Sequence, residues 1–78
     1  MKKIEFEITD PFIELIKLLK AEGIAETGGH AKGIVERGEV TRNGEIELRK
    51  RAKLIVGDVI EVRGETIEIV QGTDEILS

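Results

Sequence analysis

The dipeptide Asn43-Gly44 is the feature that most restricts how this 78-residue chain can fold. It lies between two short stretches, residues 40–42 and 45–48, in which apolar and polar side chains alternate. Such alternation is typical of half-buried β-strands, and Asn-Gly readily adopts the positive φ angles that a type I′ turn requires. The sequence therefore predicts an antiparallel hairpin here.

The spacing of apolar residues before this hairpin predicts two helices. In the first, Asp10 is expected to cap the helix and Pro11 to take its first position, where a missing N–H costs nothing. Gly23 is expected to end it. The side chains predicted to face the core follow the i, i+3, i+4, i+7 spacing of a helix. They are Phe12, Leu15, Ile16 and Leu19.

The second helix is expected to begin after Thr27, whose hydroxyl can cap it, and to end at Gly38. Gly33 in its middle weakens it by about 1 kcal/mol relative to alanine. The stripe predicted to be buried consists of Ala31, Ile34 and Val35.

Strands are predicted on both sides of this helical region. Residues 3–8 alternate, with isoleucine and phenylalanine on one face and glutamate on the other. Residues 59–63 and 66–70 also alternate and are expected to pair across Gly64-Glu65, and residues 54–56 form a short apolar run. We expect one α+β domain over residues 1–78, with an N-terminal strand, two short packed helices and then antiparallel hairpins.

The remaining stretch, from Gly72 to the end of the chain, is expected to fray. No stretch is apolar enough to span a membrane, and the N-terminus lacks the apolar run of a signal peptide. We therefore expect a cytoplasmic protein, which the lack of cysteine also fits.

The residue inventory argues against catalysis. The chain has one histidine, no cysteine and no tyrosine, and its only serine is the last residue. A lone His30 lacks the second nitrogen or sulfur ligand that zinc normally takes, so we expect no metal and no cofactor. Strand alternation places many of the carboxylates on solvent-exposed faces. These are Glu5, Glu7, Glu45, Glu47, Glu61, Glu65 and Glu68.

Positive charge is concentrated in one part of an acidic chain. The formal net charge is −4, yet residues 28–53 hold seven basic and four acidic residues, a net of +3, and the rest of the chain carries −7. Four of the bases lie between Arg49 and Lys53. Such a cluster favours a surface that binds a polyanion, although a loop can also carry lysine and arginine merely for solubility.

The sequence Thr27-Gly28-Gly29 opens the second predicted helix. The helix dipole favours an anion there, and glycine lets backbone N–H groups approach a phosphate closely. An ordinary turn between two helices would have the same sequence, and the adjacent His30 can be simply a polar surface residue. Phe6 and Phe12 are both assigned to the core, which leaves no aromatic platform for stacking bases and favours a folded RNA over a single strand.

The stretch TGGHAKGIVERGEVTRNG, residues 27–44, resembles the S4 RNA-binding domain. A small hydroxyl residue opens a helix, alanine follows four positions later, and then come an aliphatic pair, glycine, valine and an Asn-Gly turn. The sequence Gly57-Asp58-Val59-Ile60 matches the strand that closes the domain, and the leucine-rich first helix matches as well. The resemblance covers residues 12–62 and is strongest to small stand-alone bacterial members, which share the basic run RKRAKLIVGD.

This resemblance implies an S4-like fold with an αL RNA-binding motif, in which the second helix and the basic loop form the RNA-binding surface. The residues that it assigns to this surface are Thr27, Gly28, Gly29, His30, Lys32, Arg37, Arg49, Lys50, Arg51 and Lys53. Two positions differ from the family, since Gly28 replaces a common arginine and Arg42 replaces a common valine. Arg42 is therefore either an additional RNA contact or an exposed residue at the sheet edge.

We expect a non-catalytic monomer that binds structured RNA, either ribosomal or transfer RNA, and that associates with the ribosome. The alternative is a protein-interaction module whose basic loop docks on an acidic partner. Binding to RNA would weaken steeply with salt concentration, whereas a protein interface with an apolar centre would be less sensitive.

Overall fold

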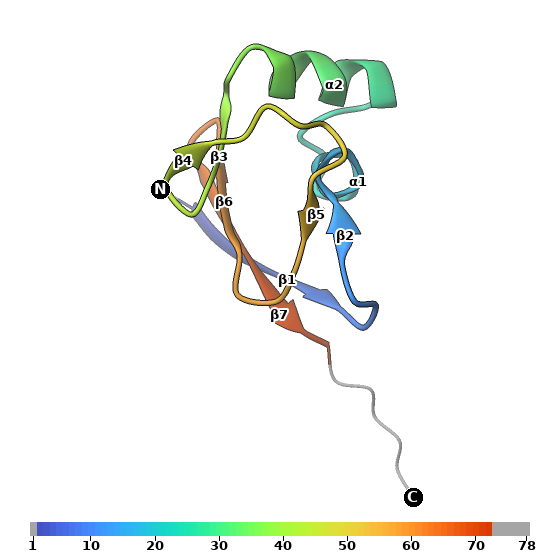
Figure 1. The fold of residues 1–78 in the computed structure, drawn as a ribbon, viewed down its shortest axis with the longest axis vertical. Helices are drawn as coiled ribbons and strands as arrows, with labels where there is room; N and C mark the ends of the chain where they lie inside the picture. The colour runs from blue at the N-terminus through green and yellow to red at the C-terminus, as the bar shows by residue number, and fades with distance from the viewer. Residues whose placement is uncertain (1, 73–78) are drawn as a thin grey trace, which may run out of the picture.

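The computed structural model describes residues 2–72 and places two helices against a mixed sheet (Figure 1). The first four elements are β1 (Lys2–Ile8), β2 (Ile13–Glu14), α1 (Leu15–Ala21) and α2 (Gly28–Glu36). The other five are β3 (Val40–Arg42), β4 (Glu45–Ile46), β5 (Lys53–Leu54), β6 (Val59–Val62) and β7 (Glu65–Gln71). The predicted α+β class is confirmed. The expectation that the chain frays after Gly72 falls outside the described residues.

The main sheet has the strand order β1-β7-β6-β3-β4, and β2 and β5 form a separate two-stranded ribbon. Strand β1 pairs with β7 in parallel, with Ile4 opposite Ile67, whereas the other neighbours in the sheet are antiparallel. The sequence predicted both strands of the β1–β7 pair but not their pairing, because 60 or so residues separate them and no local pattern links them.

The two predicted hairpins form, with one shift in position. Asn43 and Gly44 have φ angles of 52° and 89°, as the predicted type I′ turn requires. The second turn is centred on Arg63 and Gly64, with φ angles of 49° and 79°, and Val62 pairs with Glu65. This turn therefore lies one residue earlier than predicted.

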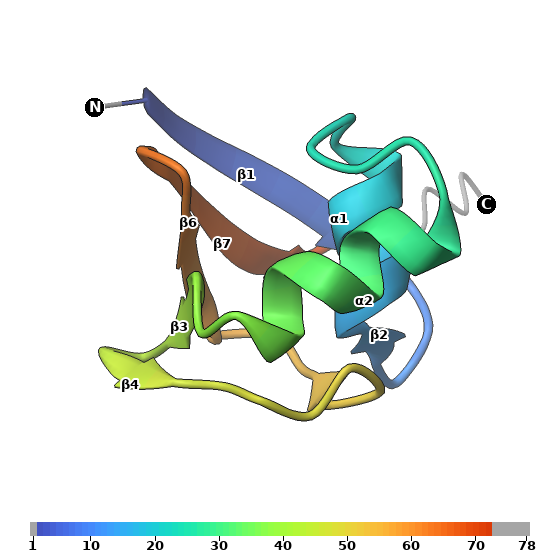
Figure 2. The same ribbon diagram turned by 90° about the horizontal axis from the view of Figure 1, so that it is seen from above.

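Both helices lie on the same side of the sheet (Figure 2), and their apolar residues join those of the sheet in one hydrophobic core. The stripe predicted for α2 is confirmed, since its three residues are fully buried. Burial of an aliphatic side chain of this kind contributes about 1.5–3 kcal/mol. The largest fully buried side chains of the two layers are Leu15, Leu18, Leu19, Ile34, Val35, Val40, Ile60, Val62, Ile67 and Ile69.

The first helix begins later than predicted. Asp10 and Pro11 do not cap it, because α1 starts at Leu15 and the residues just before it form β2. The chain is drawn into this strand by pairing with β5, in which Ile13 lies opposite Leu54. Phe12 consequently lies outside the helix and is 37% exposed, so its assignment to the core was wrong.

The alternation predicted for residues 45–48 does not hold, although Glu45 is exposed as expected. Glu47 was expected on the solvent face but is 8% exposed, whereas Ile46 and Leu48 are 63% and 60% exposed. The carboxylate of Glu47 contacts two guanidinium groups, that of the largely covered Arg42 and that of the exposed Arg49. Ile46 lies in β4, the edge strand of the sheet, and Leu48 follows this strand.

No helix within residues 2–72 is both long enough and apolar enough to cross a membrane.

Candidate functional site

The four clustered bases lie on a segment that we call the basic loop, residues 49–53, which follows β4 and ends at Lys53, the first residue of β5. The chain from β4 to β5, drawn in yellow, runs below α2 in Figure 1 and reaches the start of α1. Ala52 within the loop is only 4% exposed, so the loop packs against the domain.

Main-chain hydrogen bonds hold the basic loop against the start of α1. The N–H of Leu15 donates to the carbonyl of Ala52 at 3.0 Å, and the N–H of Ile16 donates to that of Lys50 at 3.1 Å. These are N–H groups of the first turn of α1, which have no partners inside the helix. The basic loop therefore caps α1 and has a defined backbone.

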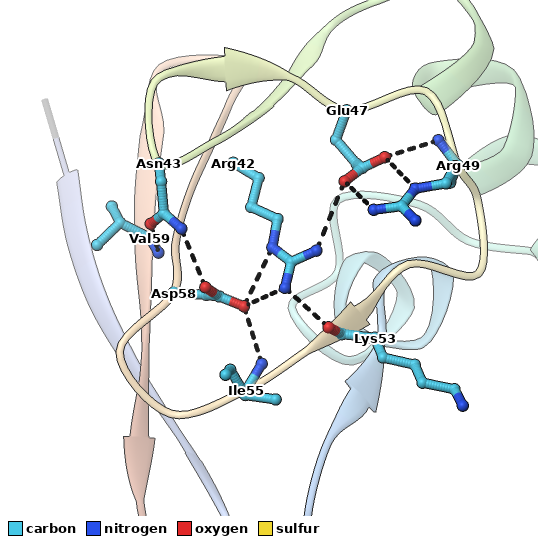
Figure 3. A network of polar contacts seen from close by, with 8 residues as sticks. All are labelled: Arg42, Asn43, Glu47, Arg49, Lys53, Ile55, Asp58 and Val59. Carbon is cyan, nitrogen blue, oxygen red and sulfur yellow. Dashed lines mark hydrogen bonds and ion pairs between the residues drawn. The ribbon is translucent and has the colours of Figure 1, made fainter.

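Arg42 is the centre of a polar network beneath this loop (Figure 3). Its Nη2 donates to Asp58 Oδ2 at 2.7 Å and to the carbonyl of Lys53 at 2.9 Å, and its Nη1 lies 3.6 Å from Glu47 Oε1. The side chain is 22% exposed. Arg42 is thus not the exposed edge residue considered above, because its donors connect β3 to the chain on both sides of the basic loop.

Asp58 is the second member of the network. Its carboxylate accepts hydrogen bonds from Asn43 Nδ2 at 3.0 Å and from the N–H of Ile55 at 2.9 Å, in addition to those from Arg42. Burial would raise the pKa of Asp58, but the combined bonds from Ile55, Asn43 and Arg42 lower it overall. Asn43 Oδ1 also accepts from the N–H of Val59 at 2.8 Å. Hydrogen bonds therefore join the Asn43-Gly44 turn to the segment that begins with Gly57-Asp58.

Within residues 2–72, Arg49 is the one base of the loop that forms an ion pair. Glu47 Oε2 accepts from the N–H of Arg49 at 3.0 Å and from its Nε at 3.1 Å. The pKa of Glu47 is lowered, chiefly by the side-chain hydrogen bond from Arg49 and against the opposing effect of burial. The guanidinium is still 75% exposed, but its charge is already balanced.

The other three bases of the loop form no ion pair among residues 2–72. Arg51 and Lys53 are exposed, and Lys50 is half-buried. Their side chains supply the uncompensated positive charge of this region.

The first turn of α2 has the predicted cap. Thr27 Oγ1 accepts from the N–H of His30 at 3.1 Å, and His30 Nδ1 accepts from the N–H of Glu26 at 3.3 Å. The N–H groups of Gly28 and Gly29 donate to no group within residues 2–72. A Cβ added at Gly28 would meet nothing within 4 Å, and one added at Gly29 would meet only Thr27 Oγ1, at 4.0 Å.

The two remaining predicted bases are paired with acids. Lys32 Nζ lies 4.0 Å from Glu36 one turn along α2, and Arg37 Nε lies 2.8 Å from Glu39 at the far end of the helix. Hydrogen bonds from Arg63 and then Arg37 lower the pKa of Glu39 to about 2. Arg37 follows the last residue of α2, so it lies at the opposite end of the helix from Thr27.

Sequence reasoning missed Glu47 and Asp58 as residues that position the site. Alternation placed Glu47 on the solvent face, and Asp58 entered only as part of a family motif. The signal available for Asp58 was its position directly after Gly57, whose φ of 100° turns the chain into β6.

Comparison with known proteins identifies the family of this chain. The S4 domain family matches residues 6–70. The Escherichia coli protein named "Putative RNA-binding protein YbcJ" is 38% identical over 60 residues, covering 77% of this chain and 86% of that protein. The Bacillus subtilis protein named "Probable ribosome maturation protein RlbA" is 39% identical over 57 residues, covering 73% and 80%.

A solved structure has the same fold. The solution structure of YbcJ from E. coli, described as having an αL motif involved in RNA binding, superposes with a TM-score of 0.63 at 34% identity. The match covers 90% of this chain and 87% of that one. The predicted S4-like fold is confirmed.

Proposed function

The chain belongs to the S4 domain family, and from this premise we propose that it binds structured RNA, either ribosomal or transfer RNA. The observation that carries the proposal is the basic loop, whose backbone is held in place while Lys50, Arg51 and Lys53 have no acidic partner among residues 2–72. The names of the relatives, an RNA-binding protein and a ribosome maturation protein, support the same conclusion.

The proposed interface combines two kinds of phosphate contact. Lysine and arginine of the basic loop supply charge, which makes affinity strongly dependent on salt concentration. The free N–H groups of Gly28 and Gly29 supply directional donors at the positive end of the α2 dipole. Both kinds of contact read the shape of an RNA backbone more than the identity of its bases.

We propose that binding involves no catalysis. His30 is the only histidine of the chain, and its Nδ1 accepts a hydrogen bond from the N–H of Glu26 as part of the helix cap. This contact gives His30 a structural role.

Filter binding across a range of salt concentrations tests the proposal. One variant carries Lys50→Gln, Arg51→Gln and Lys53→Gln, and its matched control carries Lys3→Gln, Lys17→Gln and Lys20→Gln, which removes the same formal charge elsewhere. The ligand is a folded ribosomal RNA hairpin or a transfer RNA, compared with a single-stranded homopolymer.

For the folded RNA, the log–log salt slope should flatten by about two to three units in the basic-loop variant and by much less in the control. Equal slopes for the two variants, or tighter binding of the homopolymer by the wild-type protein, would refute the proposal. Loss of RNA binding with retained capture of an acidic protein would favour the protein-interaction alternative.

A further inference from the structure

The ribbon formed by β2 and β5 has an outer face next to the basic loop. Ile13 pairs with Leu54, which is fully buried, so this pair faces the core. Glu14 pairs with Lys53 and therefore lies on the opposite, outer face. Continuing the antiparallel register by one position brings Phe12 opposite Ile55 on this same outer face.

This outer face presents an aromatic ring beside a free cation. Phe12 and Ile55 are 37% and 50% exposed, and Lys53 Nζ lies 5.0 Å from the centroid of the Phe12 ring. Phe6, the other phenylalanine of the chain, packs against the core instead. Phe12 is thus the aromatic side chain available for contact with a ligand.

The backbone around this ring is held from several directions. The carbonyl of Lys53 accepts a hydrogen bond from Arg42, and the N–H of Ile55 donates to Asp58. The N–H of Leu15, directly after β2, donates to the carbonyl of Ala52. Both strands of the ribbon are therefore fixed relative to the basic loop, and the ring occupies a defined position beside it.

We propose that Phe12, with Lys53 and Ile55 beside it, is a stacking site for one unpaired base of the RNA. The inference rests on the proposed function, because the basic loop must first hold the neighbouring phosphates. Nucleobases stack on exposed aromatic rings, and a cation at the ring edge adds to this attraction. As a base arrives, the Lys53 ammonium moves from the ring to the adjacent phosphate.

The charge around the ring explains why a base and not the RNA backbone occupies this place. Glu14 lies across from Lys53 on the same face, and Asp10 precedes Phe12 by two residues. These carboxylates repel phosphate, whereas a neutral base is unaffected by them. The site therefore distinguishes an RNA that has an unpaired nucleotide from a perfect duplex.

Fluorescence gives a direct test, because the chain has no tryptophan and no tyrosine. Phe12→Trp places a single fluorophore at the site. Val70→Trp is the matched control, since Ile67 and Ile69 are buried and Val70 therefore lies on the other face of β7. Each variant is titrated with three RNA hairpins that have a perfect stem, one unpaired purine, or an abasic residue in place of that purine.

We expect the unpaired purine to quench Phe12→Trp emission, and the other two hairpins to leave it nearly unchanged. Phe12→Leu should lower affinity for the hairpin with the unpaired purine by about tenfold and leave affinity for the perfect stem within about twofold. Emission of Val70→Trp should not respond to which hairpin is added.

Two results overturn the proposal and are distinguishable. Binding of all three hairpins with equal affinity, dependent on the basic loop and without quenching at position 12, would overturn the stacking site alone. Failure of the wild-type protein to bind any of the hairpins would overturn both the stacking site and the proposed function. Thermal unfolding of each variant verifies that it is folded. If Phe12→Trp does not fold, Phe12→Leu still provides the affinity test.

Discussion

Arg42 and Arg51 are nine positions apart in the basic part of the chain, and the structure uses them in different ways. Arg42 is largely covered, and its guanidinium contacts Asp58, Glu47 and the carbonyl of Lys53. Arg51 is exposed and has no ion pair among residues 2–72. The first arginine holds the loop in place, and the second leaves its charge available to a ligand.

This difference shows that formal charge overstates the charge available for binding. Of the seven bases in residues 28–53, four have a carboxylate partner. The partnered residues are Lys32, Arg37, Arg42 and Arg49. The three bases of residues 28–53 that form no ion pair within residues 2–72 are Lys50, Arg51 and Lys53, and all three belong to the basic loop.

The largest expected effect is the loss of stability when the network is broken. Asp58→Ala removes the acceptor of four hydrogen bonds and leaves Arg42 partly buried without its main partner. The free energy of unfolding should fall by about 2–4 kcal/mol, measured by urea denaturation. Glu45→Ala is the control, because this exposed carboxylate in β4 forms no ion pair within residues 2–72. A loss no larger than that of the control would mean that the network does not hold the fold.

A second variant asks whether backbone donors contribute beside side-chain charge. Gly29→Leu should weaken RNA binding by about 1–2 kcal/mol, because the side chain shields the two free N–H groups of α2. Thermal stability should change little, since a Cβ at Gly29 would meet only Thr27 Oγ1, at 4.0 Å. Gly29→Ala, with a side chain too short to shield these groups, is the control.

Amide chemical shifts of residues 28–31 during titration with RNA provide the independent measurement for this variant. Shifts confined to the basic loop, with wild-type affinity retained in Gly29→Leu, would contradict a backbone contribution.

Two single substitutions within the basic loop compare a base that is paired with an acid and a base that is not. Arg51→Gln should flatten the log–log salt slope of RNA binding by nearly one unit. Arg49→Gln should change it by less than half as much, because Glu47 already balances the Arg49 charge. Both slopes come from filter binding of the same RNA. Equal effects of the two substitutions would mean that RNA displaces Glu47 from Arg49, so that the Glu47–Arg49 ion pair does not reduce the charge available for binding.

The smallest effect is expected at the exposed pair formed by Glu39 with Arg37 and Arg63. The pKa of the Glu39 carboxyl is about 2, below its ordinary value of 4.5. A carboxylate with a lowered pKa stabilises the fold fully above its ordinary pKa and loses this contribution as the pH falls toward the lowered value. The wild-type protein should therefore lose slightly more stability than Glu39→Gln between about pH 4.5 and pH 2.

Urea denaturation at pH 5 and pH 2.5 measures this difference, and RNA binding at pH 7 should be the same for both proteins. Parallel stability losses would show that this surface pair contributes nothing.

Part of the candidate site followed from the sequence through the basic run and the α2 cap, whose residues are neighbours in the chain. The sequence did not show which of the charged side chains are paired with each other and which are free. Arg42 and Asp58 are 16 positions apart, and alternation alone assigned Glu47 to the solvent face. Phe12 was assigned to a helix because its spacing fits one, although pairing with β5 places it on the surface.

The sequence by itself determined α2 and both hairpins, because a cap such as Thr27 and a turn such as Asn43-Gly44 act through bonds within about four residues. The tertiary structure decided three other features, which are the pairing of β1 with β7, the start of α1 and the inward turn of Glu47. The first two depend on a partner that is distant in the chain, which is β7 for β1 and the Ala52 carbonyl for Leu15. The third depends on Arg42, whose guanidinium is held by Asp58, 16 positions further along the chain. Hydrogen bonds and ion pairs of this kind form only after the chain has brought both groups together, so no local pattern records them.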